Sequence, residues 1–279
     1  MESGGAAAVR ARDESPRESP RAEARSDPTP PALRVLALGP VEVLRDGTPV
    51  PRGDWKYGKP RELLLYLLTH PEGRTREQIG LVFWPDASAA QVKNSFHVVL
   101  HHLRKALGRA DLVSFEGERY RVGWEAGVEF DAATFERETT AALRALAAGD
   151  DAARDRLRAA LSLYRGAFLA EEGAGDWHLE LRDRLARLHG EGLRAIAERL
   201  EREGAWSEAA DAYRRIVLAD ELNEDAYRRL MRCLARAGDR TQALRAYERL
   251  AALLSADLEA DPEPETVALY EELRRAQAV

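Results

Sequence analysis

The chain has 279 residues, a net charge of −6 at pH 7 and a single cysteine, Cys233. One cysteine excludes an internal disulfide and fits a reducing compartment, so Cys233 is expected to be a small core residue. The sequence has no run of about 18 apolar residues, so we expect no membrane span and a cytoplasmic protein. At this length two domains are expected.

The first 32 residues are rich in Ala, Arg, Glu, Ser and Pro and contain no hydrophobic stretch. They do not have the pattern of a signal peptide, and we expect a disordered tail that ends in the proline-rich residues 28–31. Two roles are open for this tail. Its five arginines could contact DNA or a partner, or the tail could be an inert extension.

A small sheet followed by helices is predicted over residues 33–123. Short β-type runs occupy residues 33–50 and are separated by Gly-Pro and Asp-Gly turns. A helix is expected over residues 59–70. Two capping boxes then mark the starts of two further helices, one formed by Thr75 with Gln78 and one by Ser88 with Gln91. The break between these two helices is short, which is typical of a helix-turn-helix.

The last of these helices, over residues 89–107, has two different faces. Apolar side chains recur at helical spacing on the face that should be buried, namely Val92, Phe96, Val99, Leu100, Leu103 and Leu107. The opposite face carries hydrogen-bonding and cationic groups and no carboxylate. Such a face suits a phosphate-lined groove better than an ordinary solvated surface.

Residues 112–122 alternate apolar and polar side chains around Glu116 and Gly117, which predicts a β-hairpin. Four of its side chains are expected to face the core: Val113, Phe115, Tyr120 and Val122. Arg119 and Arg121 are expected to point outward. A hairpin after such a helix is a wing, and exposed arginines on a wing suit a phosphate or a narrow minor groove.

Helix 89–107 is therefore expected to enter the major groove of double-stranded DNA. The candidates for reading bases are Gln91, Asn94, Val98 and His101. The candidates for holding phosphates are Lys93, Arg104, Lys105, Arg119 and Arg121, with backbone contacts also expected from Thr75 and Arg76. For Gln91 a second interpretation is open, in which its side chain serves only the capping box.

His97 belongs to the same face and is expected to hydrogen-bond to bases or phosphates. His97 and His101 are spaced i, i+4 and could form half of a zinc site. No third ligand is evident in the sequence, so we predict no metal and no cofactor. No motif of an enzyme nucleophile or metalloprotease occurs either, so we predict that the chain is not an enzyme.

Charge is unevenly distributed along the chain. Residues 33–123 contain 14 Lys and Arg against 10 Asp and Glu, a net of +4. Residues 124–279 contain 23 and 32, a net of −9. The positive part should contact DNA, whereas the acidic remainder should be repelled by it.

From Phe130 onward the pattern is almost purely helical and contains an internal repeat of 34 residues. The first copy carries Leu193, Ile196, Leu200, Gly204, Ala209, Ala210, Ala212 and Tyr213. The second carries Tyr227, Leu230, Leu234, Gly238, Ala243, Leu244, Ala246 and Tyr247. This period and these small residues are typical of tetratricopeptide repeats, which bind peptides or proteins. A degenerate earlier repeat is expected over residues 151–169 and a closing helix over 264–276.

The fold class predicted from these features is mainly α with a small antiparallel sheet. A winged helix-turn-helix domain at residues 33–123 precedes an all-α repeat domain at residues 124–279. With these motifs the chain resembles the SARP-type transcription activators, in which an OmpR/PhoB-class winged helix precedes a bacterial transcriptional activator domain. The matching stretches are residues 83–88, 94–108, 130–131, 164–169, 176–177, 232–238, 242–247 and 261–270.

The resemblance covers residues 33–275. It implies a nucleoid-associated activator that binds direct repeats near a promoter, contacts RNA polymerase and self-associates through its helical repeats. The sequence departs from the family at His97, His101 and His102, where many relatives carry arginine. No receiver domain precedes the winged helix, and no GxxxxGK[ST] loop follows the repeats.

Two other functions are consistent with the sequence. In the first, the chain is a protein-interaction adaptor whose repeats carry the function and whose winged helix no longer binds DNA. In the second, the chain binds DNA but represses transcription, since one polypeptide could block or recruit polymerase from the same site.

Overall fold

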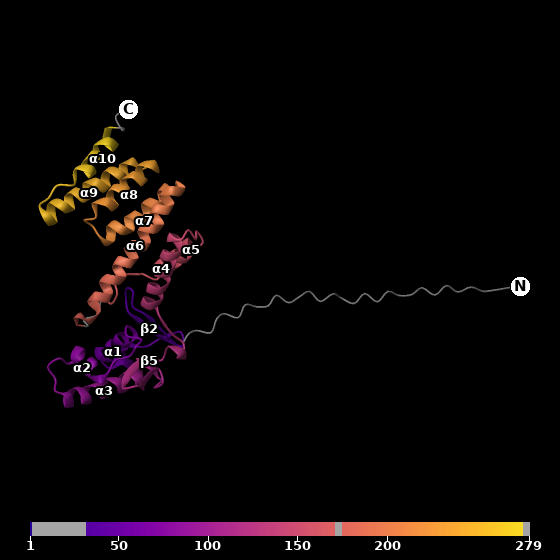
Figure 1. Cartoon of the computed structure of the whole chain (residues 1–279), viewed down its shortest axis with the longest axis vertical. Coiled ribbons are helices and arrows are strands. Elements are labelled where there is room, and N and C mark those ends of the chain that lie inside the picture. Colours follow the sequence, from indigo (N-terminus) through magenta and orange to yellow (C-terminus); the bar gives the residue numbers. More distant parts are fainter. Residues whose placement is uncertain (2–31, 171–174, 276–279) are drawn as a thin grey trace. The chain divides into compact units, whose positions relative to one another are not determined.

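A computed structural model of the chain describes Met1, residues 32–170 and residues 175–275. The predicted tail therefore lies outside the described residues, apart from its two ends. The fold is mainly α with a small sheet, as predicted (Figure 1). None of the described helices is long and apolar enough to cross a membrane.

The sheet has four short strands in the order β3-β2-β1-β6. They are β1 (Leu33–Leu36), β2 (Glu42–Arg45), β3 (Thr48–Pro49) and β6 (Val128–Phe130). β1 and β2 pair antiparallel, whereas β1 and β6 pair parallel. The sheet is thus mixed rather than purely antiparallel, and it takes one strand from beyond residue 123, where the sequence analysis placed the domain boundary. A parallel partner needs a long crossover, which the three helices and the hairpin provide.

Three helices follow β3: α1 (Gly58–Leu68), α2 (Arg76–Phe83) and α3 (Ala89–Leu107). Both capping boxes form, with Thr75 at the start of α2 and Ser88 at the start of α3. Gly80 lets the two helices approach closely, since a Cβ there would lie 2.7 Å from a methyl carbon of Val92. α3 ends at Gly108, whose φ of 68° suits a glycine C-cap. Both ends of α3, the second helix of the helix-turn-helix, are therefore fixed by caps.

The predicted hairpin consists of β4 (Val113–Glu116) and β5 (Arg119–Val122). Val113, Tyr120 and Val122 are buried, as expected. Phe115 was expected in the core, but its side chain is 55% exposed. It packs on the ring of its cross-strand partner Tyr120, with centroids 4.6 Å apart, and so lies on the inner face of the hairpin but past the edge of the core.

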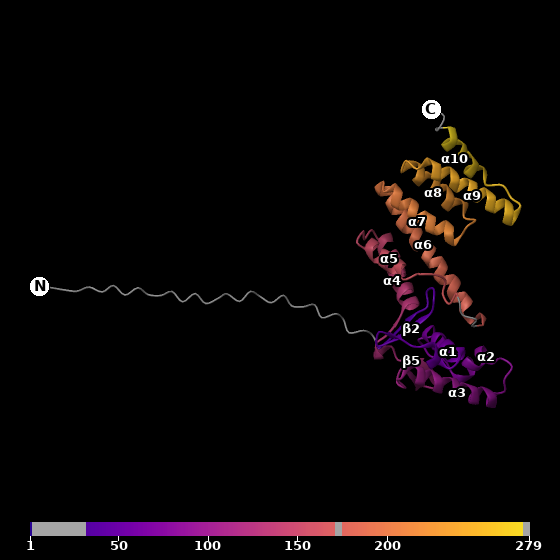
Figure 2. The ribbon, with the colours of Figure 1, turned by 180° about the vertical axis from the view of Figure 1, so that it is seen from behind.

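Most of the rest of the described chain is helical, as predicted, although only residues 153–162 of the degenerate repeat expected over 151–169 form a helix. Its helices are α4 (Asp131–Ala147), α5 (Ala153–Ser162), α6 (Leu179–Glu203), α7 (Trp206–Ala219), α8 (Glu224–Arg236), α9 (Arg240–Leu258) and α10 (Pro264–Arg275). Helices α6 to α10 lie side by side in chain order in both views (Figures 1 and 2). Gly204 and Gly238 follow α6 and α8 with positive φ and turn the chain into the second helix of each pair.

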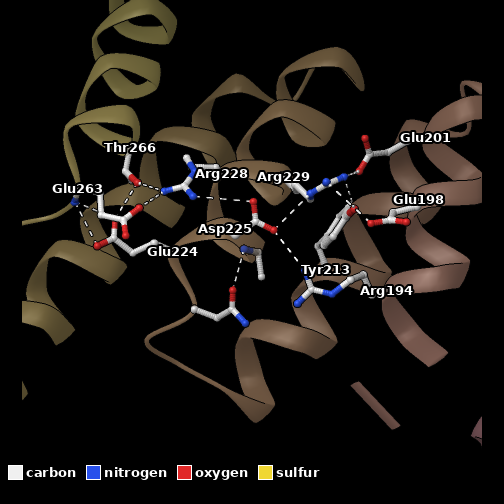
Figure 3. Close-up of polar contacts among 12 residues, drawn as sticks. Arg194, Glu198, Glu201, Tyr213, Glu224, Asp225, Arg228, Arg229, Glu263 and Thr266 are labelled. Carbon is white, nitrogen blue, oxygen red and sulfur yellow. Dashed lines mark hydrogen bonds and ion pairs between the residues drawn. The ribbon is translucent and has the colours of Figure 1, made fainter. Parts of the chain in front are cut away.

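A charged network fastens these helix pairs together (Figure 3). Arg229 on α8 lies at its centre, within 3.8 Å of Glu198, 3.5 Å of Glu201 and 3.4 Å of Asp225. Its guanidinium also donates to the hydroxyl of Tyr213, at 3.3 Å. Burial raises the pKa of that phenol, which therefore remains protonated. The network neutralises Arg229 within the fold.

The repeats attach directly to the backbone next to the sheet through hydrogen bonds. The carboxylate of Asp131 accepts hydrogen bonds from the backbone N–H groups of Ala37 and Leu38, at 2.8 and 3.1 Å. Burial raises the pKa of this carboxyl, while the two donors and Arg165 act in the opposite direction. Leu38 also forms an antiparallel bridge with Phe168, in the segment that follows α5. A buried, hydrogen-bonded seam therefore joins the two parts.

A second contact joins the repeats to α1. Trp177 lies in a short 3-10 helix before α6, Asp176–His178. Its indole N–H donates to the Glu62 carboxylate at 3.3 Å, and its ring meets that of Tyr66 edge-on with centroids 5.3 Å apart. Together with the seam at Asp131, this contact joins the repeats to residues 33–123 at two separate points.

Candidate nucleic-acid interface

The exposed face of α3 carries seven of the predicted DNA-contacting residues together. They are Gln91, Lys93, Asn94, His97, Val98, His101 and Lys105. No Asp or Glu occurs anywhere in the helix. Val98 is an exposed apolar side chain in the middle of this polar face, with 51% of its surface accessible. A methyl-bearing side chain among amide and imidazole groups has the composition needed to contact base edges, including the methyl group of thymine.

The opposite face of α3 is anchored in the core. Phe96, Leu103 and Leu107 are fully buried. The ring of Phe96 meets that of Tyr120 on the wing, with centroids 4.5 Å apart. Near the other end of the helix, Arg45 on β2 donates to the carbonyl oxygen of Ala106. Because the buried side is fixed in this way, the exposed side is presented at one orientation, as base reading requires.

Several of the predicted contacts already have a local partner. The Gln91 side chain accepts from the backbone N–H of Ser88 at 2.8 Å, so its capping role is confirmed. Thr75 caps α2, since its hydroxyl accepts from the backbone N–H of Gln78 at 3.2 Å. Arg76 pairs with Glu77 at 3.1 Å. Gln91 stays exposed and keeps its amide NH2 group for a further contact, so a second role in base reading remains a prediction.

The predicted phosphate contacts divide into two groups. Lys93 and Lys105 are exposed and form no ion pair with any residue that the structure describes. Arg104, by contrast, donates to the carbonyl of Val113 at 2.8 Å, and Arg119 donates to the carbonyl of Gly73 at 3.1 Å. Arg121 lies 3.9 Å from the Glu116 carboxylate. The wing arginines were expected to point outward, but both are half-buried. Arg119 fastens the hairpin to the segment before α2, whereas Arg121 pairs within the hairpin.

The histidines of α3 do not form a metal site within the described part of the chain, where no group of three His, Cys, Asp or Glu side chains comes together. His97 and His101 lie on the exposed face. His102 is turned toward Tyr57, which it meets edge-on at 5.7 Å between centroids.

A comparison with models of protein families identifies the family to which the helical repeats belong. The model of the bacterial transcriptional activator domain matches residues 130–274, from the end of β6 to α10. The chain belongs to this family. The match covers the helical repeats and leaves residues 33–123 outside it. Membership confirms the resemblance to SARP-type regulators for the repeat part of the chain.

Two relatives extend the similarity beyond the repeats into residues 33–123. The regulatory protein AfsR of Streptomyces griseus is 32% identical over 257 residues, which is 88% of this chain and 25% of AfsR. The transcriptional regulatory protein EmbR of Mycobacterium tuberculosis is 27% identical over 249 residues, 86% of this chain and 63% of EmbR. The chain thus spans a quarter of one relative and under two thirds of the other.

A solved structure of Mycobacterium tuberculosis EmbR, in complex with a low-affinity phosphopeptide, shares the fold. It superposes with a TM-score of 0.62 at 25% sequence identity, covering 88% of this chain and 66% of EmbR. The similarity includes both the small sheet with its helices and the helical repeats, because 88% coverage cannot be reached by either part alone. The shared fold therefore extends from the small sheet into the helical repeats.

The sequence analysis missed one group of residues beside the exposed face of α3. Tyr57, Lys59 and Trp84 line a surface hollow of about 380 Å³ together with Asn94 and Val98. Tyr57 is 41% exposed. The signal was present in the sequence, since Lys56-Tyr57-Gly58-Lys59 interleaves cations with an aromatic residue, a composition found in nucleic-acid surfaces. The sequence analysis assigns only Lys59 of this stretch to an element, the helix over residues 59–70.

Proposed function

We propose that this chain is a sequence-specific DNA-binding activator of transcription. The observation that carries the proposal is the exposed face of α3. It gathers amide and imidazole groups, no carboxylate, and ammonium groups that have no ion-pair partner among the residues described. In this proposal α3 enters the major groove of a duplex. Asn94, at the centre of the face, is the main base-reading residue, because an Asn amide can bond an adenine edge twice.

The helical repeats carry the activating role in this proposal. Their relatives are regulatory proteins, and the chain's own family is named for transcriptional activation. The repeats contact RNA polymerase or a second copy of the chain while α3 holds the promoter. The domain organisation that we propose keeps residues 33–123 as the DNA-binding part and residues 124–279 as the activator part, with β6 completing the sheet of the first. We propose no catalytic activity.

The proposal is tested by selecting duplexes from a random pool with the full chain. The Asn94→Ala variant is then compared with the wild type on the selected duplex and on random-sequence DNA. We expect the variant to lose about 1–3 kcal/mol of binding free energy on the selected duplex, with little change on random DNA. Arg245→Gln, an exposed charge change on α9, is the control and should bind as the wild type does.

Two outcomes contradict the proposal in different ways. If the full chain retains no duplex in a salt-dependent manner, the adaptor interpretation replaces DNA binding. If the chain binds DNA but the selected and random duplexes respond equally to Asn94→Ala, then α3 does not read sequence through this residue. A selected duplex placed upstream of a reporter distinguishes activation from repression by the sign of the change in transcription.

A further inference from the structure

A strained turn lies immediately before α1. Lys56 has φ 67° and ψ −47°, and the backbone N–H of Tyr57 donates to the carbonyl of Trp55 at 2.7 Å. This bond spans three residues, so Lys56 is the centre of a γ-turn of the rare, positive-φ type. Glycine is the usual residue in such a conformation, because a Cβ makes it costly. Trp55, which is 5% exposed, anchors the turn in the core.

The turn lies on the flank of α3 that the wing does not occupy. The wing meets α3 at Phe96 and Arg104, which lie within about 80° of each other around the helix axis. Tyr57 borders Ser95, Val98 and His102, which cluster within about 60° on the other flank. Four of the predicted contacts project between the two flanks: Asn94, His97, His101 and Lys105. The exposed strip of α3 is therefore bordered on one side by the wing and on the other by this turn.

The chemistry of the turn suits a nucleic-acid strand. Lys56 is exposed and forms no ion pair with a residue that the structure describes. The ammonium of Lys59 lies 5.5 Å from the ring centroids of both Phe83 and Trp84 and donates to the carbonyl of Phe83 at 3.2 Å. An ammonium has three donors, so two of them are left for another acceptor. In the sequence, Tyr57 lies between these two lysines.

We propose that residues 56–59 form a second phosphate-binding ridge, which holds the sugar–phosphate backbone of the DNA strand on the side of α3 away from the wing. The inference rests on the proposed function of α3. In it, Lys56 and Lys59 bind successive phosphates, and the sugar between them packs against Tyr57. The strain at Lys56 is then explained by function. Glycine would fit the turn better but would supply no charge.

The ridge is tested in the full chain with Lys56→Gly. This variant relieves the backbone strain, so thermal unfolding should occur at an unchanged or higher temperature. The slope of log K against log salt should become shallower by about 0.9 on random-sequence duplex, because one phosphate contact is lost. Tyr57→Ala should weaken binding at every salt concentration, and Tyr57→Phe should retain it. Arg245→Gln is the matched loss of an exposed charge and should leave the slope unchanged.

Phosphate-ethylation interference on the selected duplex locates the contact. We expect two groups of sensitive phosphates, one on each side of the major groove. Lys56→Gly should abolish sensitivity at one phosphate of one group and leave the other group unchanged. The inference is overturned if Lys56→Gly leaves both the salt slope and the interference pattern unchanged while Asn94→Ala still relaxes specificity. Failure of every duplex to bind the wild type would instead remove the proposed function itself.

Discussion

Two groups of basic side chains in this molecule differ in what surrounds them. On α8, Arg228 and Arg229 are enclosed by carboxylates from α6, α8 and the segment before α10. On α3, Lys93 and Lys105 have no such partner among the described residues. The net charge of a chain cannot distinguish these situations. A cation is available to a phosphate when the fold leaves it unpaired, so an acidic protein can still present a cationic face.

The largest effect is expected from removing the centre of the α8 network. Arg229→Leu leaves Glu198, Glu201 and Asp225 close together without their cation. We expect a loss of about 2–3 kcal/mol in the free energy of unfolding, below the cost for a fully buried pair because these groups are partly exposed. Urea denaturation measures it. Arg214→Leu, which breaks an exposed pair with Asp211 on α7, should cost under about 0.5 kcal/mol.

If Arg229→Leu and Arg214→Leu destabilise the chain equally, Arg229 is not the centre of a stabilising network. The DNA affinity of folded Arg229→Leu protein should match that of the wild type, because the network faces the repeats and not α3. A large loss of affinity at a temperature where the variant is folded would contradict the division between the two groups.

The next effect concerns a buried histidine side chain inside the repeats. His189 stacks on Tyr164 with centroids 4.1 Å apart, and burial, with a smaller contribution from Arg215, lowers its pKa to about 4. The unfolded chain then binds more protons than the folded one between pH 6.5 and 4, so this histidine's contribution to stability is present above pH 6.5 and is lost as pH falls toward 4. We expect a loss of about 2 kcal/mol across this window.

His189→Phe keeps an aromatic ring against Tyr164 but removes the titrating group. Comparing urea midpoints of the variant and the wild type between pH 6.5 and pH 4 isolates the histidine from the carboxylates that titrate nearby. The variant should show the shallower pH dependence. Parallel curves for the two proteins would mean that His189 is not held neutral by its surroundings.

Lys93→Ala on α3 is expected to have the smallest effect on stability and the clearest effect on DNA binding. Since Lys93 has no partner among the described residues, we expect a change of under about 0.5 kcal/mol in unfolding free energy. Binding should weaken on all duplexes alike, and the salt slope should fall by about 0.9. Salt-dependent fluorescence anisotropy measures both quantities. A sequence-dependent loss would reassign Lys93 from phosphate contact to base reading.

Much of the fold was predictable because periodic patterns are strong over long elements. The bounds of α3 agree with the sequence expectation at both ends, since Ser88 and Gly108 are recognisable caps. The repeat helices followed from the spacing of their small and aromatic residues. β6 was missed because three residues are too few to show a period, and its pairing with β1 joins parts of the chain more than 90 residues apart.

The candidate site was predictable only in part, for two physical reasons. Sequence patterning identifies an exposed cation but not its partner, so the hydrogen bonds of Arg104 and Arg119 to backbone carbonyls could not be foreseen. Alternation in a hairpin likewise cannot reveal that Phe115 extends past the edge of the core. The γ-turn at Lys56 was missed because turn signals depend on Gly, Pro and Asn, and this turn uses none at its centre.

The hydrogen bonds from the backbone of Ala37 and Leu38 to Asp131 make the connection between the sheet and the repeats a fixed one, not a flexible linker. When α3 lies in the groove of a duplex, this fixed connection gives the repeats one angular position around the DNA axis. Moving the binding site by about five base pairs, half a helical turn, would carry the repeats to the far side of the promoter. Regulation by this chain should therefore follow the pitch of the double helix, strong at whole turns and weak between them.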